Sequence, residues 1–190
     1  TEAQVDVGQN RNYELSNNIP KIVFVGWLED FKGVTELLEA CKNIHNKGIK
    51  FHITLVGDGS AAISAKQFVS QNVLEECVTF NGWATTMKIE SILQKSEIFV
   101  LPSWSEGMPN AMIEAMASGL AVVVTSVGEV SDYVENEKHA LVVPPKDSKK
   151  LEQALIKLIV DKTIRKKIAL GGFELAKKYF SEQENMALLS

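Results

Sequence analysis

The chain has 190 residues, of which 45% are hydrophobic and 23% are charged, and its formal net charge is −4. This composition is typical of one globular domain with a substantial core. Such a small net charge argues against general binding to nucleic acid or anionic membranes. No apolar run has the length of a membrane span and no signal peptide opens the chain. The two cysteines are expected to be reduced thiols rather than a disulfide, which fits a cytoplasmic protein.

The two ends of the sequence predict a domain taken from a longer protein. Residues 1–19 are polar at most positions and lack periodicity, which predicts a linker before a domain at 20–190. Ser181-Glu-Gln-Glu184 has the spacing of a capping box and predicts the start of a last helix. Only six residues follow it, so we expect that helix to be truncated.

Strand and helix patterns alternate along the chain. Apolar runs predict strands, and helical spacing of apolar residues fills most segments between them. In chain order, we expect strands at 21–25, 51–56, 77–80, 97–101, 120–124 and 140–143, and helices at 34–47, 61–69, after Thr85 or Thr86, from Pro109, at 151–159 and at 163–180. Gly171-Gly172 either weakens the last of these helices or marks a close contact. The alternation predicts an α/β fold, a doubly wound parallel sheet of about six strands with helices on both faces.

The segment from Ser105 to Gly119 carries the strongest functional signal. It follows the strand at 97–101 and places Glu106 and Glu114 on either side of Pro109. Proline suits the first position of a helix, so Glu106 falls on a strand-to-helix loop and Glu114 more than a turn into the helix. Both carboxylates then face one cleft at the carboxyl end of a strand, where open α/β sheets bind ligands. The N–H groups of the helix start favour a phosphate there.

In a chain with 24 acidic residues, two glutamates at this spacing can also be a solvated helix face. The wider segment, however, resembles the Glu-x7-Glu signature of retaining glycosyltransferases of the group 1, or family 4, type, which have the GT-B fold and use nucleotide sugars. The resemblance runs through Glu114–Val124 and Gly128 and covers 20–180 overall. It implies the C-terminal, donor-binding half of a transferase. The partners would be a nucleotide sugar and the chain's own N-terminal acceptor half, and any peripheral membrane contact would pass through that half.

The resemblance also implies a role for each matching position. Glu106 would bind hydroxyls of the transferred sugar and Glu114 those of the ribose, since an ionised carboxylate offers several acceptor sites. Lys32 and the amides near Asn110 and Ala111 would hold the diphosphate. Transfer would retain the anomeric configuration, with the leaving phosphate taking the acceptor's proton. The implied catalytic residues are Glu106 and Lys32, and the implied substrate-binding residues are Gly26, Trp27, Gly57, Trp83, Gly107, Asn110, Ala111 and Glu114.

The loop after the first strand departs from the family at one position. The family has a glycine, then an arginine, then Lys-Gly, whereas here Trp27 follows Gly26 and precedes Lys32-Gly33. Loss of one of two cations weakens diphosphate binding unless another group compensates. We expect Trp27 to face the cleft, because it follows a glycine at the end of a strand. The alternative for Lys32 is an exposed loop lysine with no ligand.

Two further turns follow predicted strands. Gly57-Asp-Gly59 lacks the third glycine of a dinucleotide fingerprint, but its position matches a family turn that lines the nucleotide cleft. Asn81-Gly82-Trp83 resembles the family segment whose backbone reads the base. Trp83 either stacks on that base or packs in the core, and the sequence leaves both readings open.

No pattern predicts a metal or another cofactor. The three histidines fall on a helix, a strand and a strand entrance, and no Asp-x-Asp is present. Gly-x-Ser-x-Gly is absent too, so a metal-free reaction without a covalent nucleophile is expected. Cys41 and Cys77 lie in apolar segments and are expected to be buried thiols. Two alternative functions stay open: a sugar-nucleotide epimerase of GT-B architecture, and a nucleotide-sugar-binding module without catalytic power, which Trp27 suggests.

Overall fold

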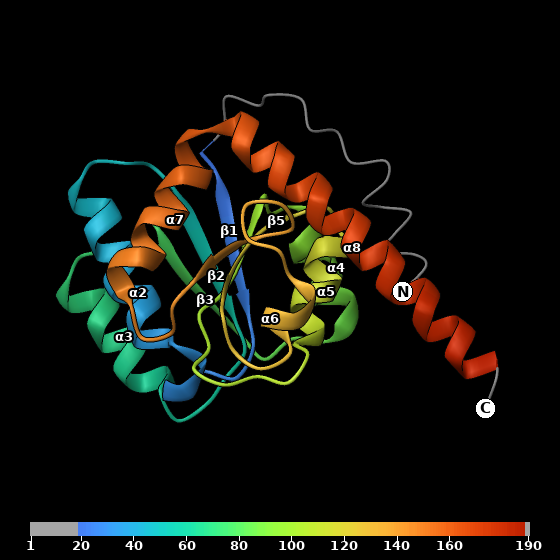
Figure 1. Ribbon diagram of the computed structural model, residues 1–190. Coiled ribbons are helices and arrows are strands. Elements are labelled where there is room, and N and C mark those ends of the chain that lie inside the picture. The colour runs from blue at the N-terminus through green and yellow to red at the C-terminus, as the bar shows by residue number, and fades with distance from the viewer. Residues whose placement is uncertain (1–18, 189–190) are drawn as a thin grey trace.

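The computed structural model describes residues 19–188, with side chains to residue 179. The described chain forms one parallel sheet with the strand order β3-β2-β1-β4-β5-β6 (Figure 1). This arrangement confirms the predicted doubly wound α/β fold. The strands are β1 (Lys21–Val25), β2 (His52–Val56), β3 (Val78–Gly82), β4 (Ile98–Leu101), β5 (Ala121–Thr125) and β6 (Leu141–Val143).

Helices cover both faces of the sheet. In Figure 1, α2, α3 and α7 lie on one side and α4, α5 and α8 on the other. Every residue of β4 and β5 is buried between these layers, which explains why the two strands show no polar alternation. The helical elements are η1 (Asp30–Lys32), α2 (Val34–Asn46), α3 (Ala62–Gln71), α4 (Thr86–Gln94), α5 (Asn110–Ala117), α6 (Val130–Tyr133), α7 (Ser148–Val160) and α8 (Lys162–Leu188).

The strand order reverses between β1 and β4. The chain adds β2 and β3 on one side of β1, then crosses back so that β4 pairs with the other side of β1. The loops leaving β1 and β4 start at this reversal, and the carboxyl edge between these two strands is the crevice where such folds usually bind ligands. The loops of interest are 26–33 and 102–109.

One predicted helix boundary is wrong. Ser181 was expected to begin a new helix, but α8 runs without a break from Lys162 to Leu188. Residues 182–188 are mostly good helix formers, so the preceding helix continues through the capping-box sequence. Two single turns, η1 and α6, had no periodic signal and were not predicted.

The glycine pair in α8 marks a close contact. A Cβ on Gly171 would lie 1.9 Å from the carbonyl oxygen of Lys138, and one on Gly172 would lie 2.8 Å from that of His139. The helix can approach this loop only because both positions lack a side chain. Of the two readings of Gly171-Gly172, the close contact is the one that the structure supports.

Other local predictions also hold. The Thr85 side chain accepts from the N–H of Lys88, so Thr85 rather than Thr86 caps α4. Cys41 and Cys77 are free and buried, as expected from their apolar surroundings.

Candidate functional site

Two loops meet across the crevice between β1 and β4. Lys32 ends the single turn η1, and Gly33 after it has a φ of 70°. A Cβ on Gly33 would lie 2.0 Å from the carbonyl oxygen of Pro102, so only glycine permits this approach. The backbone N–H of Trp104 also donates to the carbonyl of Phe31 at 2.7 Å. The two loops are thus held against each other by backbone contacts.

The two residues predicted to be catalytic are in direct contact there. Lys32 Nζ lies 2.6 Å from Glu106 Oε1, and the two side chains are only 17% and 11% exposed. Partial burial strengthens this charge-assisted contact relative to a surface pair. Lys32 is therefore not an isolated loop lysine. The sequence could not indicate this pairing, because the partners are 74 positions apart.

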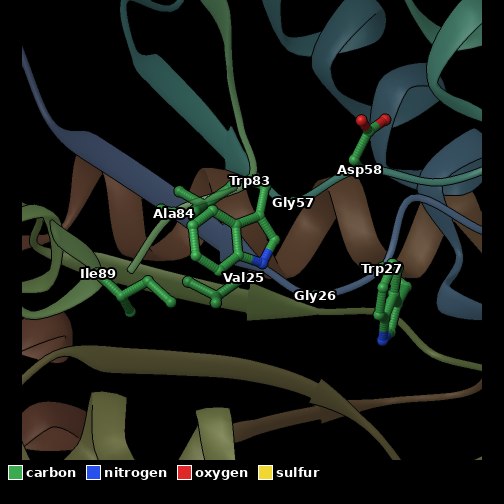
Figure 2. A pocket seen from close by; sticks show the side chains of 9 residues that line it. Val25, Gly26, Trp27, Gly57, Asp58, Trp83, Ala84 and Ile89 are labelled. Carbon is green, nitrogen blue, oxygen red and sulfur yellow. The ribbon is translucent and has the colours of Figure 1, made fainter. Parts of the chain in front are cut away.

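A second group of predicted residues lines one cavity of about 240 Å³. It lies at the carboxyl ends of β1, β2 and β3, and Figure 2 shows Trp27 and Trp83 on its walls. Trp27 is 64% exposed and Trp83 is 72% exposed, so neither is a core residue. The lining residues are Val25, Gly26, Trp27, Val56, Gly57, Asp58, Trp83, Ala84 and Ile89.

Glycine also shapes the wall of this cavity. Gly57 has a φ of 138°, and a Cβ there would lie 1.9 Å from the carbonyl oxygen of Gly26. Its N–H donates to the carbonyl of Gly82 at 2.9 Å. The N–H of Leu28 donates to the carbonyl of Asp58 at 3.0 Å. The turn after β2 is thus hydrogen-bonded to the loop after β1 on one side and to the end of β3 on the other.

The start of α5 presents backbone donors that have no acceptor in the described part of the chain. Pro109 occupies the N-cap and offers no side-chain acceptor. Gly107 and Asn110 are exposed and Ala111 is half-buried. The N–H groups of Met112 and Ile113 donate to the carbonyl of Pro109. Those of Asn110 and Ala111 have no acceptor among the described residues, so they and the positive end of the helix dipole are available to an anion.

Glu114 is half-buried on α5, and its carboxylate has no hydrogen-bond or ion-pair partner among the described residues. Burial raises the pKa of this carboxyl above its usual range, and the nearby Glu90 carboxylate raises it further. A partly desolvated carboxylate without a partner is costly, which is typical of ligand-binding positions. No contact joins Glu114 to Glu106 or to the cavity, so their shared cleft stays a prediction.

Sequence reasoning missed three polar residues at this edge of the sheet. Asp58 lines the cavity. Ser103 and Thr125 are buried beneath Glu106, with exposed fractions of 0% and 1%. Ser103 follows a strand three positions before Glu106, but nothing in the sequence shows that it is buried.

Across residues 19–188, no three His, Cys, Asp or Glu side chains gather as a metal ion would require. Within the same range, no helix combines the length and apolarity needed to cross a membrane.

The family model and the relatives that match this chain are all glycosyltransferases. A family model described as "Glycosyl transferases group 1" matches residues 19–161. The chain is 30% identical over 141 residues to the putative colanic acid biosynthesis glycosyltransferase WcaL of Escherichia coli. It is 31% identical over 144 residues to the amylovoran biosynthesis glycosyltransferase AmsK of Erwinia amylovora. These matches cover 71% and 73% of this chain but 35% of each relative, so the chain spans about a third of their length.

Solved structures with a similar fold include the following two. The C-terminal domain of a glycosyl transferase group 1 family protein (LpcC) from Francisella tularensis superposes with a TM-score of 0.78 at 26% identity, covering 95% of this chain and 94% of that one. Anabaena Alr3699/HepE, solved with UDP and glucose, superposes with a TM-score of 0.80 at 20% identity, covering 100% of this chain and 53% of that one. The second likeness shows the shared fold alone.

Proposed function

The chain belongs to the group 1 glycosyl transferases, and from this premise we propose that it is the donor-binding half of a retaining transferase that uses a nucleotide diphosphate sugar. The observation that carries the proposal is the contact between Lys32 and Glu106 at the crevice between β1 and β4. It brings a cation for phosphate and a carboxylate for hydroxyl groups to one place, where open α/β sheets bind nucleotides.

The diphosphate is assigned to Lys32 and the start of α5. Lys32 supplies a positive charge that neutralises the leaving diphosphate as the glycosidic bond breaks. The free N–H groups near Gly107, Asn110 and Ala111 add donors aligned with the helix dipole. This pairing provides electrostatic stabilisation from the chain's own groups, and we propose that the reaction uses no resident metal or other cofactor.

The nucleoside is assigned to the cavity and to Glu114. The two exposed indoles of Trp27 and Trp83 offer flat apolar surfaces for a base or sugar ring. Glu114 accepts hydrogen bonds from the ribose hydroxyls, which supply the partners that its carboxylate otherwise lacks. Gly26 and Gly57 keep the cavity wall free of side chains.

Glu106 is assigned to the transferred sugar. Its carboxylate accepts from the sugar hydroxyls and places the anomeric carbon beside the leaving phosphate. That phosphate then takes the proton of the acceptor hydroxyl on the same face, which retains the configuration. The acceptor-binding N-terminal half of the protein completes the cleft. We place the reaction in the cytoplasm, with any membrane contact made through that half.

A non-catalytic nucleotide-sugar-binding module is the second candidate, because Trp27 stands where a second cation is expected. Turnover by the full-length protein separates the two. Sugar transfer supports the enzyme, whereas tight nucleotide-sugar binding without transfer or hydrolysis supports the module.

Calorimetric titration of this chain with UDP, GDP and ADP tests the assignment. At least one of them should bind, and Lys32→Ala should weaken that binding about tenfold or more through loss of a charged hydrogen bond. Lys138→Ala is the matched control, because it removes a lysine from an exposed ion pair with Glu135. Absence of binding by all three nucleotides, or equal effects of the two variants, would contradict the proposed function.

A further inference from the structure

Two buried hydroxyl residues, Thr125 and Ser103, lie beneath Glu106. Thr125, the last residue of β5, donates from Oγ1 to the carbonyl oxygen of Ser103 at 2.6 Å. Ser103 in turn donates from its own Oγ to Glu106 Oε1 at 2.6 Å. Both hydroxyl residues are almost fully buried, at 1% and 0% exposure. Hydrogen bonds that are shielded from water hold their geometry more firmly than exposed ones.

The two donors that reach Glu106 use the same oxygen. Lys32 Nζ and Ser103 Oγ each lie 2.6 Å from Oε1. Oε2 has no hydrogen-bond partner among the described residues. It is also not one of the fully buried side-chain oxygens that lack a partner. One face of the carboxylate is thus fixed, and the other oxygen stays available for an incoming hydroxyl.

The backbone of Glu106 is confined from the other side. Gly128 has a φ of 53°, and a Cβ there would lie 1.8 Å from the carbonyl oxygen of Glu106. The loop after β5 therefore presses directly against Glu106, and no side chain fits between them. Backbone and carboxylate are restrained independently.

Lys32 alone is a poor anchor for this carboxylate. Its ammonium lies at the end of a flexible four-carbon stem and must also serve the diphosphate. Ser103 has a short, buried side chain that follows a central strand, and it has no role with phosphate. When a diphosphate draws Lys32 away, Ser103 still holds Oε1.

We propose that Ser103 is a positioning residue that fixes Glu106 so that Oε2 faces the hydroxyl groups of the donor sugar. This inference rests on the proposed function for the identity of the ligand. The anchoring of Glu106 by Ser103 can be tested without any ligand.

A double-mutant cycle tests the coupling. The quantity measured is the ratio of the affinity for UDP-glucose to that for UDP, or the corresponding GDP-mannose and GDP ratio if guanine nucleotides bind. Ser103→Ala should lower this ratio about tenfold, as expected for one hydrogen bond to a charged group, while the affinity for the bare nucleotide changes less than about threefold. Glu106→Gln should lower the ratio at least as much, and the double variant no further. Additive losses, or an unchanged ratio in Ser103→Ala, would overturn the proposal.

Ser96→Ala is the matched control. Ser96 is also a buried serine, at 4% exposure, and its Oγ donates to the carbonyl of Ile92 at 2.9 Å. It precedes β4, whereas Ser103 follows the same strand at its other end. Ser96→Ala should lower the melting temperature as Ser103→Ala does, yet leave the affinity ratio unchanged. If both variants lower the ratio equally, the effect is loss of stability and the positioning role is wrong.

Crystal structures of the free protein and of Ser103→Ala separate this proposal from the proposed function. The Glu106 carboxylate should occupy one orientation in the parent chain and more than one in the variant. An unmoved carboxylate in Ser103→Ala would overturn the positioning role even if nucleotides bind. Conversely, failure of every nucleotide to bind, with Glu106 released in the variant, would reject the proposed function and retain the anchoring.

Discussion

At the scale of single residues, Lys32 and Glu106 balance each other's charge at short range. Their contact of 2.6 Å, at 17% and 11% exposure, means that in the proposed function a diphosphate would share the ammonium with a carboxylate that repels it. In that proposal, binding of the bare nucleotide and binding of the sugar place opposite demands on Glu106.

Glu106→Gln should tighten the binding of a bare nucleoside diphosphate by about fivefold, or roughly 1 kcal/mol, because the amide keeps the shape and removes the repelling charge. Titration calorimetry with UDP, GDP and ADP measures this. Glu135→Gln is the control, since it removes the charge of an exposed ion pair. If Glu106→Gln weakens binding of the bare nucleotide as much as Lys32→Ala does, the carboxylate does not compete with the diphosphate for Lys32.

Trp27→Arg should be tolerated, because Trp27 is 64% exposed and lines the cavity. We expect a change of less than about 0.5 kcal/mol in unfolding free energy. Nucleoside diphosphate binding should tighten by about fivefold, as for a favourable exposed ion pair, and should depend more steeply on salt. Val160→Arg adds the same charge at the end of α7, at a residue 62% exposed. Equal affinities in the two variants would place Trp27 away from the diphosphate.

Glu114 should make stability depend on pH in a defined direction. Its pKa is raised in the folded protein by burial, so the folded state binds more protons than the unfolded state between the two pKa values. The free energy of unfolding then falls as pH rises through that window. The full loss of stability, caused by ionising the partly buried carboxyl, is reached above the folded-state pKa. Glu114→Gln should therefore stabilise the protein at pH 7–8, an advantage that disappears below about pH 4.

Urea denaturation of the parent chain and of Glu114→Gln, at pH 7–8 and below about pH 4, measures this difference in unfolding free energy. Glu137→Gln is the contrasting control, because a hydrogen bond from Lys157 lowers the pKa of Glu137 and its contribution has the opposite sign. That variant should give no stabilisation at neutral pH. Destabilisation of the protein by Glu114→Gln at pH 7–8 would mean that the carboxylate has a partner in the folded state.

At the scale of elements, regular patterns were predictable and contacts across the sheet were not. The six apolar runs located every strand to within two residues at either end, because central parallel strands are apolar throughout. The capping box at Ser181 failed, since the same residues also extend an existing helix. The pairing of Lys32 with Glu106 and the burial of Ser103 depend on how the loops after β1, β4 and β5 converge. No local sequence pattern predicts how these three loops come together.

Because α8 contacts the loop before β6, we expect Gly171→Ala in α8 to destabilise the protein. In an exposed helix, Gly→Ala stabilises by about 1 kcal/mol. At Gly171 the added Cβ would lie 1.9 Å from the carbonyl oxygen of Lys138, so Gly171→Ala should instead destabilise by about 1–3 kcal/mol. Thermal unfolding checks this, with Gly107→Ala as the control because its Cβ would meet nothing within 4 Å. A stabilised Gly171→Ala protein would show that the contact is easily relieved.

At the scale of the whole molecule, the chain corresponds to only part of the length of its relatives. It spans 35% of the length of the WcaL and AmsK relatives, yet it covers 94% of the separately solved C-terminal domain of LpcC. Its candidate site lies at the open carboxyl edge of the sheet, where a second domain can close over a bound donor. The proposed nucleotide binding can be tested on this chain alone, because the groups assigned to the nucleotide all belong to it.

The sharpest test of the donor-site assignment is a crystal structure of this chain with the nucleoside diphosphate that binds most tightly. We expect the diphosphate within about 3 Å of Lys32 Nζ and of the N–H groups of Asn110 and Ala111. We also expect the ribose hydroxyls on Glu114 and the base against Trp83, as this assignment requires. A nucleotide seated away from the crevice between β1 and β4, with Lys32 still bound only to Glu106 and Glu114 still unpaired, would contradict it.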